Sequence, residues 1–351
     1  MRTALTLSAA FFLTACASGL TRSETMMKGA DLYATNTCVV TARTETDGMP
    51  DRGDAADDPA VWVSPADPAK SRILGTNKQT GLYVYGLDGG QLQFLPVGRT
   101  NNVDIRGTLA VGSNDEVFDD VGGLSWFRID PLSAEVAHLG DTPVGKVEPY
   151  GVCLGDIGGE IIAGTTYKDG TVQLWALRGK GDAFPAAELV RTVKLGSKLE
   201  GCVFDDAANT LFIGEEEVGI WKLDLADPAS TPVSVDTIAA GNGLVADVEG
   251  ISLWEGPDGT GFLLASAQAA DRFVVYDRAA PHTPRGVFSV GETASIDAVS
   301  HTDGLDVVST PLPGYPQGLL VVQDDANPAS EVAQNFKLVS WADVMTALGL
   351  E

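Results

Sequence analysis

The chain has 351 residues, of which 44% are hydrophobic, so it can bury a sizeable core and is not disordered as a whole. Its 48 acidic residues outnumber 23 basic ones, which gives a formal net charge of −25. Such a charge repels nucleic acid and anionic membrane surfaces, so we expect no nucleic-acid partner. It suits divalent cations, which take carboxylate oxygens as ligands, although excess acid also serves plain solubility.

The first residues are typical of an export signal. Arg2 is positively charged, and residues 4–14 form an apolar stretch that is too short for a stable membrane span. The stretch ends in Leu13-Thr14-Ala15-Cys16, which resembles a bacterial lipobox, where cleavage precedes a cysteine that carries lipid. The alternative is an ordinary signal peptide cleaved near residues 15–17.

The predicted organisation is therefore a signal peptide over residues 1–15, a tether over 16–35 and a folded domain over 36–351. We expect an exported monomer, either an outer-membrane lipoprotein or a periplasmic or extracellular protein. Its only membrane attachment would be lipid on Cys16.

Three further cysteines follow, Cys38, Cys153 and Cys202. Because their number is odd and no C-x-x-C pair occurs, a disulfide framework or a zinc site has weak support. Cys153 and Cys202 lie in equivalent apolar segments, and we interpret these two as small buried hydrophobic residues.

One short phrase returns six times, 44 to 54 residues apart: a polar residue, then in most copies a small one, then an apolar run. The first residues of the six copies are Asp58, Asn102, Tyr150, Glu200, Glu249 and Asp303. A period of this length is typical of solenoids, arrays and propellers.

Each period holds short apolar runs separated by Gly, Asp, Asn and Pro, a pattern that predicts strands and turns. The first unit gives strands over 60–63, 72–76, 82–87 and 92–97, and the fourth gives 202–204, 210–214, 219–223 and 233–238. The sixth unit has only three, over 305–308, 318–322 and 335–339, so residues 37–42 would supply its fourth.

The predicted fold is all-β, a six-bladed β-propeller of four-stranded blades whose last blade is completed by an N-terminal strand. A β-sandwich would not need six-fold regularity. Residues 341–350 alone are typical of a helix, a short terminal one.

In such a ring the innermost strands line the central channel, and the corner after each second strand lies at the same channel mouth. That mouth is expected to hold ten acids: Asp57, Asp58, Glu148, Glu200, Glu215, Glu216, Asp247, Glu249, Asp303 and Asp324. So many carboxylates in a small volume must spread out, protonate or bind cations. Oxygen ligands without suitably spaced histidines favour calcium over zinc or copper. The alternative for any one acid is that it only stabilises a turn at the solvent-exposed rim of the propeller.

Three residues break the acidic pattern of the mouth. Lys78 and Lys168 occupy the same corner in different units, and Tyr150 replaces the acid of the third phrase. Lysines beside metal-binding carboxylates suit a polyanion such as phosphate. Each lysine could instead be a surface residue that pairs with a neighbouring acid.

Several ordered segments resemble the β-propeller phytases, the calcium-dependent 3-phytase family. They include 54–62, 76–78, 81–85, 101–106, 150–151, 200–201, 215–216, 220–222, 247–250, 276–278, 303–306 and 335–337. The resemblance implies hydrolysis of phosphate monoesters of myo-inositol hexakisphosphate (phytate) by metal-activated water at the channel mouth, with several Ca²⁺ ions as cofactors.

The resemblance also implies residue roles. The implied calcium ligands are Glu45, Asp57, Asp58, Glu200, Glu216, Asp247, Glu249, Gln268, Asp297, Asp303 and Asp324. The implied catalytic set, including the phosphate contacts, is Lys78, Tyr150, Lys168, Glu200, Glu216, Glu249 and Asp303.

Two positions depart from the family pattern. Asp115 stands where the family usually has an arginine that holds phosphate, and Gln79 stands where a second lysine often follows the first. Positive charge at the phosphate site is therefore reduced, and Arg99 and Arg106 are the candidates to restore it. Two alternatives follow: a non-catalytic propeller that binds calcium and polyphosphates, and a calcium-dependent propeller lactonase. Lys78 and Lys168 disfavour the lactonase.

Overall fold

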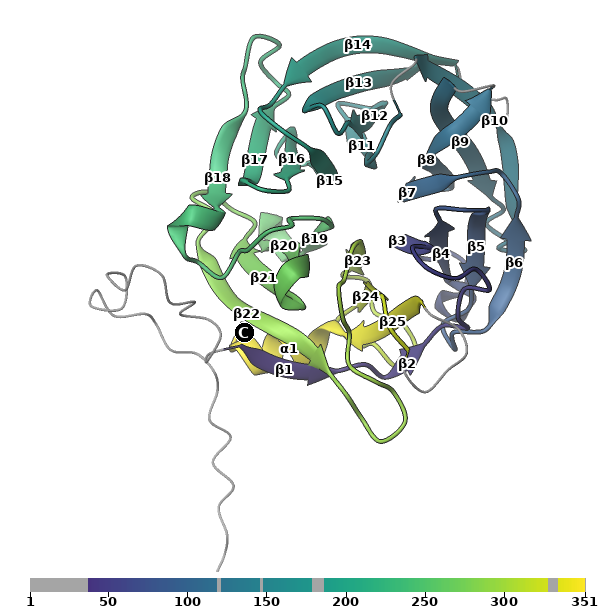
Figure 1. Cartoon of the computed structure of the whole chain (residues 1–351), viewed down its shortest axis with the longest axis vertical. Helices are drawn as coiled ribbons and strands as arrows, with labels where there is room; N and C mark the ends of the chain where they lie inside the picture. Colours follow the sequence, from purple (N-terminus) through teal and green to yellow (C-terminus); the bar gives the residue numbers. More distant parts are fainter. Residues whose placement is uncertain (1–36, 119–120, 146–147, 179–185, 328–333, 351) are drawn as a thin grey trace, which may run out of the picture.

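Six β-sheets are arranged in a ring around a common axis, as the computed structural model shows (Figure 1). The structure describes residues 37–118, 121–145, 148–178, 186–327 and 334–350. The predicted signal peptide, the lipidated Cys16 and the tether lie outside these residues. Within the described ranges, no helix has the length and apolarity that crossing a membrane requires.

Each blade is built from consecutive antiparallel strands. Blade one has β3 (Ala56–Trp62), β4 (Arg72–Asn77), β5 (Gly81–Tyr85) and β6 (Gln91–Leu95). Blade two has β7 (Thr100–Arg106), β8 (Leu109–Phe118), β9 (Val121–Ile129) and β10 (Val136–Gly145). Blade three has β11 (Val152–Ile157), β12 (Glu160–Thr166), β13 (Thr171–Arg178) and β14 (Ala186–Lys194).

The second half of the ring continues in the same order. Blade four has β15 (Leu199–Asp205), β16 (Thr210–Glu215), β17 (Gly219–Asp224) and β18 (Val233–Thr237). Blade five has β19 (Ile251–Glu255), β20 (Gly261–Ala267), β21 (Arg272–Asp277) and β22 (Pro284–Gly291). Blade six has β23 (Leu305–Val308), β24 (Leu319–Asp324) and β25 (Asn335–Ser340). The helix α1 (Trp341–Leu348) follows, as expected, and short 3₁₀ turns cover Pro68–Lys70, Ile238–Ala240, Pro257–Gly259 and Gln268–Ala270.

An N-terminal strand does complete blade six, but the residues differ from those expected. The fourth strand is β2 (Thr44–Glu45), which pairs antiparallel with β25. The segment predicted for this place forms β1 (Cys38–Thr41) instead, and it pairs parallel with β22 as a fifth strand of blade five. The chain therefore closes two neighbouring blades in succession, and both sheets gain a covered edge.

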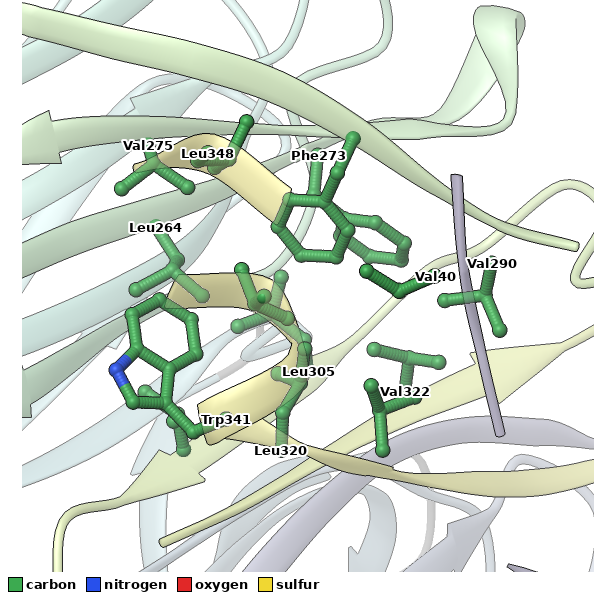
Figure 2. Packing of buried hydrophobic residues seen from close by; sticks show 14 of the residues in the cluster. Val40, Leu264, Phe273, Val275, Val290, Leu305, Leu320, Val322, Trp341 and Leu348 are labelled. Atoms are coloured by element: carbon green, nitrogen blue, oxygen red, sulfur yellow. The ribbon is translucent and has the colours of Figure 1, made fainter. Parts of the chain in front are cut away.

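The core lies between neighbouring blades rather than at the centre of the ring. Six clusters of buried apolar side chains each join the facing sides of two adjacent blades. Figure 2 shows the cluster between blades five and six, where Val40 of β1, Leu264 of β20 and Leu320 of β24 lie with Trp341 and Leu348 of α1. The alternating apolar pattern of the strands supplies a buried face to each neighbour, which is why the ring needs no separate central core.

The repeated phrase joins one inner strand to the next. The amides of Gly201 and Gly250 donate to the carbonyls of Glu249 and Asp303 in the following blades, each at 3.1 Å. A Cβ on Gly201 would collide with the Glu249 carbonyl oxygen, so glycine is required by this close approach. The small residue of the phrase thus closes the ring.

The same contacts correct the predicted register in blades one and two. The amide of Gly304 donates to Asp57 O at 3.1 Å, which places Asp57 rather than Asp58 at the position of the acids Glu249 and Asp303. Likewise Asn102 N bonds to Ser113 Oγ as Gly250 N bonds to Ser266 Oγ, both at 2.9 Å. The equivalent residues around the mouth, here called the mouth ring, are therefore Asp57, Asn101, Tyr150, Glu200, Glu249 and Asp303.

The interpretation of Cys153 and Cys202 as simple hydrophobic residues is wrong. Cys153 of β11 and Cys202 of β15 form a disulfide between blades three and four. The two strands run side by side in the ring, so residues 49 positions apart in the sequence can come within bonding distance. Cys38 is buried in the apolar cluster between blades five and six.

Candidate active site

Three glutamates of the mouth form a buried acidic group. Glu200 Oε2, Glu216 Oε1 and Glu249 Oε2 are buried and lack a hydrogen-bond partner among the described residues. One carboxylate oxygen of each lies within 4.8 Å of those of the other two. Burial raises the pKa of Glu249 to about 7, and burial followed by repulsion from Glu249 raises the pKa of Glu200 well above its usual range. The group is therefore short of positive charge.

Lys78 holds a second pair of ring acids. Its Nζ lies 3.1 Å from Asp57 Oδ1, 3.3 Å from Asp303 Oδ2 and 3.0 Å from Asp54 Oδ1. Burial raises the pKa of Asp57 to about 7 and that of Asp303 to about 8, despite the nearby ammonium group. Burial alone would lower the pKa of Lys78, but the surrounding carboxylates outweigh it and raise that pKa. Lys78 stays a cation and only partly neutralises this pair.

Tyr150 lies beneath two further ammonium groups. Lys168 Nζ is 4.3 Å and Lys198 Nζ is 4.8 Å from the centroid of its ring. Burial, followed by the charge of Glu200, raises the pKa of its phenol, so the hydroxyl keeps its proton.

Some of these residues line an open cavity of about 500 Å³. Its walls include Lys78, Tyr150, Lys198, Asp247, Glu249, Gln268, His301 and Asp303. Gln268 also donates from Nε2 to Asp303 Oδ1. The cavity therefore combines cations with acidic groups, and of the residues expected at the mouth it is lined by Lys78, Tyr150, Asp247, Glu249 and Asp303.

Some of the expected mouth acids lie elsewhere. Asp58 points down the channel, where Oδ2 accepts from Val103 N at 3.0 Å, beside a small cavity of about 30 Å³. Glu215 turns into its own blade and accepts from Ser197 Oγ and Trp221 Nε1, both at 2.7 Å. Glu148 is exposed on the rim. The structure therefore separates Asp58 and Glu215 from the acids around the cavity.

Three implied calcium ligands surround an ammonium group away from the cavity. Lys337 Nζ lies 2.6 Å from Glu45 Oε2, 2.7 Å from Asp297 Oδ1 and 3.0 Å from Asp324 Oδ2. Asp297 Oδ2 and Asn335 Oδ1 are buried and, within the described part of the chain, find no hydrogen-bond donor. This side-chain cluster, here called the Lys337 cluster, joins β24 and β25 of blade six to its closing strand β2.

The glutamate group fits a hard divalent cation. It offers oxygen donors only, they converge, and three of its buried oxygens lack a partner among residues that the structure describes. Such a set matches the preference of Ca²⁺ for several carboxylate oxygens in a flexible arrangement. The neighbouring lysines suit an anionic ligand held at the same place.

Comparison with known proteins agrees with this geometry. A family model described as Phytase matches residues 5–351. The chain belongs to the Phytase family. A 3-phytase of Bacillus subtilis (strain 168) is 34% identical over 328 residues, covering 88% of this chain and 85% of the relative. A solved structure described as "Structure of U3-55K" has a TM-score of 0.51 at 9% identity and covers 82% of this chain and 79% of that one, which supports the fold alone.

Within this Phytase family member, the departure at Asp115 has a direct neighbour of opposite charge. Arg99 Nη2 lies 3.3 Å from Asp115 Oδ2, and the amide of Asp115 donates to Arg99 O at 2.9 Å. Arg106 lies at the opposite end of β7, pairs with Asp206 at 3.1 Å and lines a separate cavity of about 300 Å³. Arg99 is therefore the arginine at the mouth, and Arg106 is not. Gln79 Nε2 donates to the carbonyls of Arg52 and Asp54.

Sequence reasoning missed five residues of the cavity wall: Lys198, His301, Asp54, Asp325 and Gly53. The first two lie two positions before a member of the mouth ring, as do Arg99 and Asp247. The backbone at this position pairs with the second corner, since Glu216 N donates to Lys198 O and Gln268 N donates to Asp247 O. The signal was therefore present in the repeat, and the corrected register in blade two adds Arg99 to it.

Proposed function

We propose that this chain hydrolyses phosphate monoesters of phytate at the channel mouth and that calcium is required. The observation that carries the proposal is the group Glu200, Glu216 and Glu249, whose convergent, unpartnered oxygens lie beside a cavity lined with lysines. Family membership and the 3-phytase relative support the same substrate and reaction.

The chain's own residues would bind and orient the substrate. Lys78 and Lys168 supply ammonium groups to the phosphates, and the protonated Tyr150 hydroxyl donates a hydrogen bond to a phosphate oxygen. The mouth acids Asp57, Glu200, Glu216, Asp247, Glu249 and Asp303, with Gln268, would hold the calcium ions. When bound, these ions supply positive charge for the phosphates and lower the pKa of the water that attacks phosphorus.

The test is phosphate release from phytate with calcium, with a chelator, and with calcium restored. We expect release only when calcium is present. A correctly folded protein that releases no phosphate at saturating calcium would refute the proposal. Calorimetric binding of phytate without turnover would then favour a non-catalytic polyphosphate-binding propeller, and a panel of lactones tests the lactonase alternative, which family membership disfavours.

Arg99 is proposed as the substitute for the arginine that Asp115 replaces. Its side chain is half-exposed and is free to leave a surface ion pair of small energy. Arg99→Gln should therefore raise KM for phytate, and Asp115→Asn should lower it, because that change removes a competing negative charge. If both variants keep the wild-type KM at fixed calcium, neither residue contacts substrate.

Further calcium binding is proposed at the Lys337 cluster and at Asp58. A cation beside Glu45, Asp297 and Asp324 would need the Lys337 ammonium to shift, and Asp297 Oδ2 is available as a donor oxygen. Calorimetry of the wild type against Asp297→Asn should show one fewer bound ion. An unchanged stoichiometry would remove this cluster from the calcium sites.

Export, a lipid anchor on Cys16 and a monomeric state are also proposed. The Cys153–Cys202 disulfide supports export, since such bonds persist in oxidising compartments. Cys16→Ala should move the protein from the membrane fraction to the soluble fraction. Size-exclusion chromatography with light scattering tests the monomer. Equal partition of both forms would argue against the anchor.

A further inference from the structure

Lys198 occupies a position between the glutamate group and the cavity. Its Nζ lies 2.8 Å from Glu216 Oε2 and 4.8 Å from the centroid of the Tyr150 ring, and its side chain is 40% exposed. The residue also lines the cavity together with Lys78. Its backbone is fixed, because Lys198 O accepts from Glu216 N at 3.1 Å.

The partner of Lys198 is the feature that gives it two possible roles. Glu216 has one oxygen bound to this ammonium and the other, Oε1, buried without a hydrogen-bond partner among the described residues. Glu216 also belongs to the group that offers convergent oxygens to a cation. A divalent cation bound there would compete with the ammonium for Glu216 and repel it.

A released Lys198 would have a short way to travel. Its four-carbon stem is flexible, its end is partly solvated, and the adjacent cavity already holds Lys78 and the face of Tyr150. An anion placed in the cavity would meet ammonium groups from two sides. This matters more here than in a chain with full positive charge, since Asp115 and Gln79 remove cations from the expected pattern.

We propose that Lys198 exchanges partners: it is the counter-ion of Glu216 in the metal-free protein and becomes a phosphate-binding residue when a divalent cation takes Glu216. The inference rests on the proposed function, because the anion is a substrate phosphate. It adds a residue that sets substrate affinity, and it couples binding of the cation to binding of the anion.

The experiment compares Lys198→Gln and Lys198→Arg with the wild type. Lys194→Gln is the matched control, because Lys194 is an exposed lysine that also pairs with an acid, Asp169, at 2.9 Å. Calorimetry first measures calcium binding in the absence of any anion. A second titration, at saturating calcium, measures binding of myo-inositol hexakissulfate, an analogue of the substrate that cannot release phosphate.

Two opposite effects are expected from Lys198→Gln. Calcium binds more tightly, because a competing cation is gone, and the hexakissulfate binds about tenfold more weakly, because one charge-assisted contact of about 1.4 kcal/mol is lost. KM for phytate rises by a similar factor with little change in kcat. Lys198→Arg keeps most of the analogue affinity, and Lys194→Gln matches the wild type in both titrations.

Unchanged analogue affinity in Lys198→Gln would overturn the proposal, as would weaker calcium binding, which would mean that Lys198 only supports the site. These titrations are separate from turnover. If the wild type binds calcium and the analogue but releases no phosphate, the proposed function fails while the role of Lys198 in anion binding is still decided by the variants.

Discussion

The disulfide between blades three and four should contribute measurably to stability. The perturbation is the double change Cys153→Ala and Cys202→Ala, which leaves no buried thiol behind. The bond closes a loop of 49 residues. By the chain-entropy model, a disulfide that closes a loop of this length stabilises the folded state by about 4 kcal/mol, because it restricts the unfolded chain. For roughly 300 ordered residues the entropy of unfolding is about 0.6 kcal/mol per degree, so the melting temperature should fall by about 6 °C.

The assay is urea unfolding of the wild type and the double variant, followed by tryptophan fluorescence. Intact mass without reductant should show the wild type lighter by two hydrogen atoms than its reduced form. Cys38→Ala is the control, since Cys38 lies outside the bond and its removal should preserve that mass difference. A wild type whose midpoint does not change when it is reduced, and which lacks the mass difference, would refute the reasoning.

Three further changes test the electrostatics and the closure of the ring. Burial raises the pKa of Asp57 and Glu249 to about 7 and of Asp303 to about 8, so the folded metal-free protein holds protons that the unfolded chain has lost. Its stability should therefore fall as pH rises from about 4 through 8, and melts in chelator that show the reverse trend would contradict this. Glu249→Gln removes one repelling carboxylate, so it should raise the melting temperature of the metal-free protein at pH 8. The same change should lower calcium-dependent phosphate release at least about 100-fold. A variant with a lower melting temperature and lower activity would point to misfolding. Ser266→Ala removes the buried hydroxyl that joins Gly250 N to Asp303 O, both at 2.9 Å. It should lower the free energy of unfolding in urea by about 1–3 kcal/mol, and an unchanged midpoint would contradict this.

The fold was predictable because the repeat and the strand pattern agree. Alternating apolar residues give each strand a buried face, and a period near 49 residues leaves room for four strands in each unit. The closing strand was harder to place. Residues 38–41 form the more apolar strand, but they are used to cover blade five, while the two residues Thr44 and Glu45 complete blade six. Two residues are too few to leave a periodic signal.

The site was predictable by residue type and less so by position. Asp57 and Asp58 are adjacent acids, and so are Glu215 and Glu216, but only one of each pair reaches the acids around the cavity. Successive residues of a strand point to opposite faces, and in β3 a register shift between Ala56 and Pro59 decides which acid faces the mouth. The disulfide was missed for a related reason, because counting cysteines gives no information on which blades are neighbours.

Hydroxyl groups of the second strands bind the inner strands to one another. Ser113 Oγ donates to Tyr150 O at 2.6 Å, Thr166 Oγ1 to Glu200 O at 2.5 Å and Ser266 Oγ to Asp303 O at 2.9 Å. In each case the contact uses the backbone of the mouth ring and not its side chain. The side chain at each ring position can therefore be replaced without loss of the hydrogen bonds that hold neighbouring blades together. For that reason Tyr150 can occupy a position that is acidic in other blades. The residue type at the mouth can thus change in one blade independently of the others.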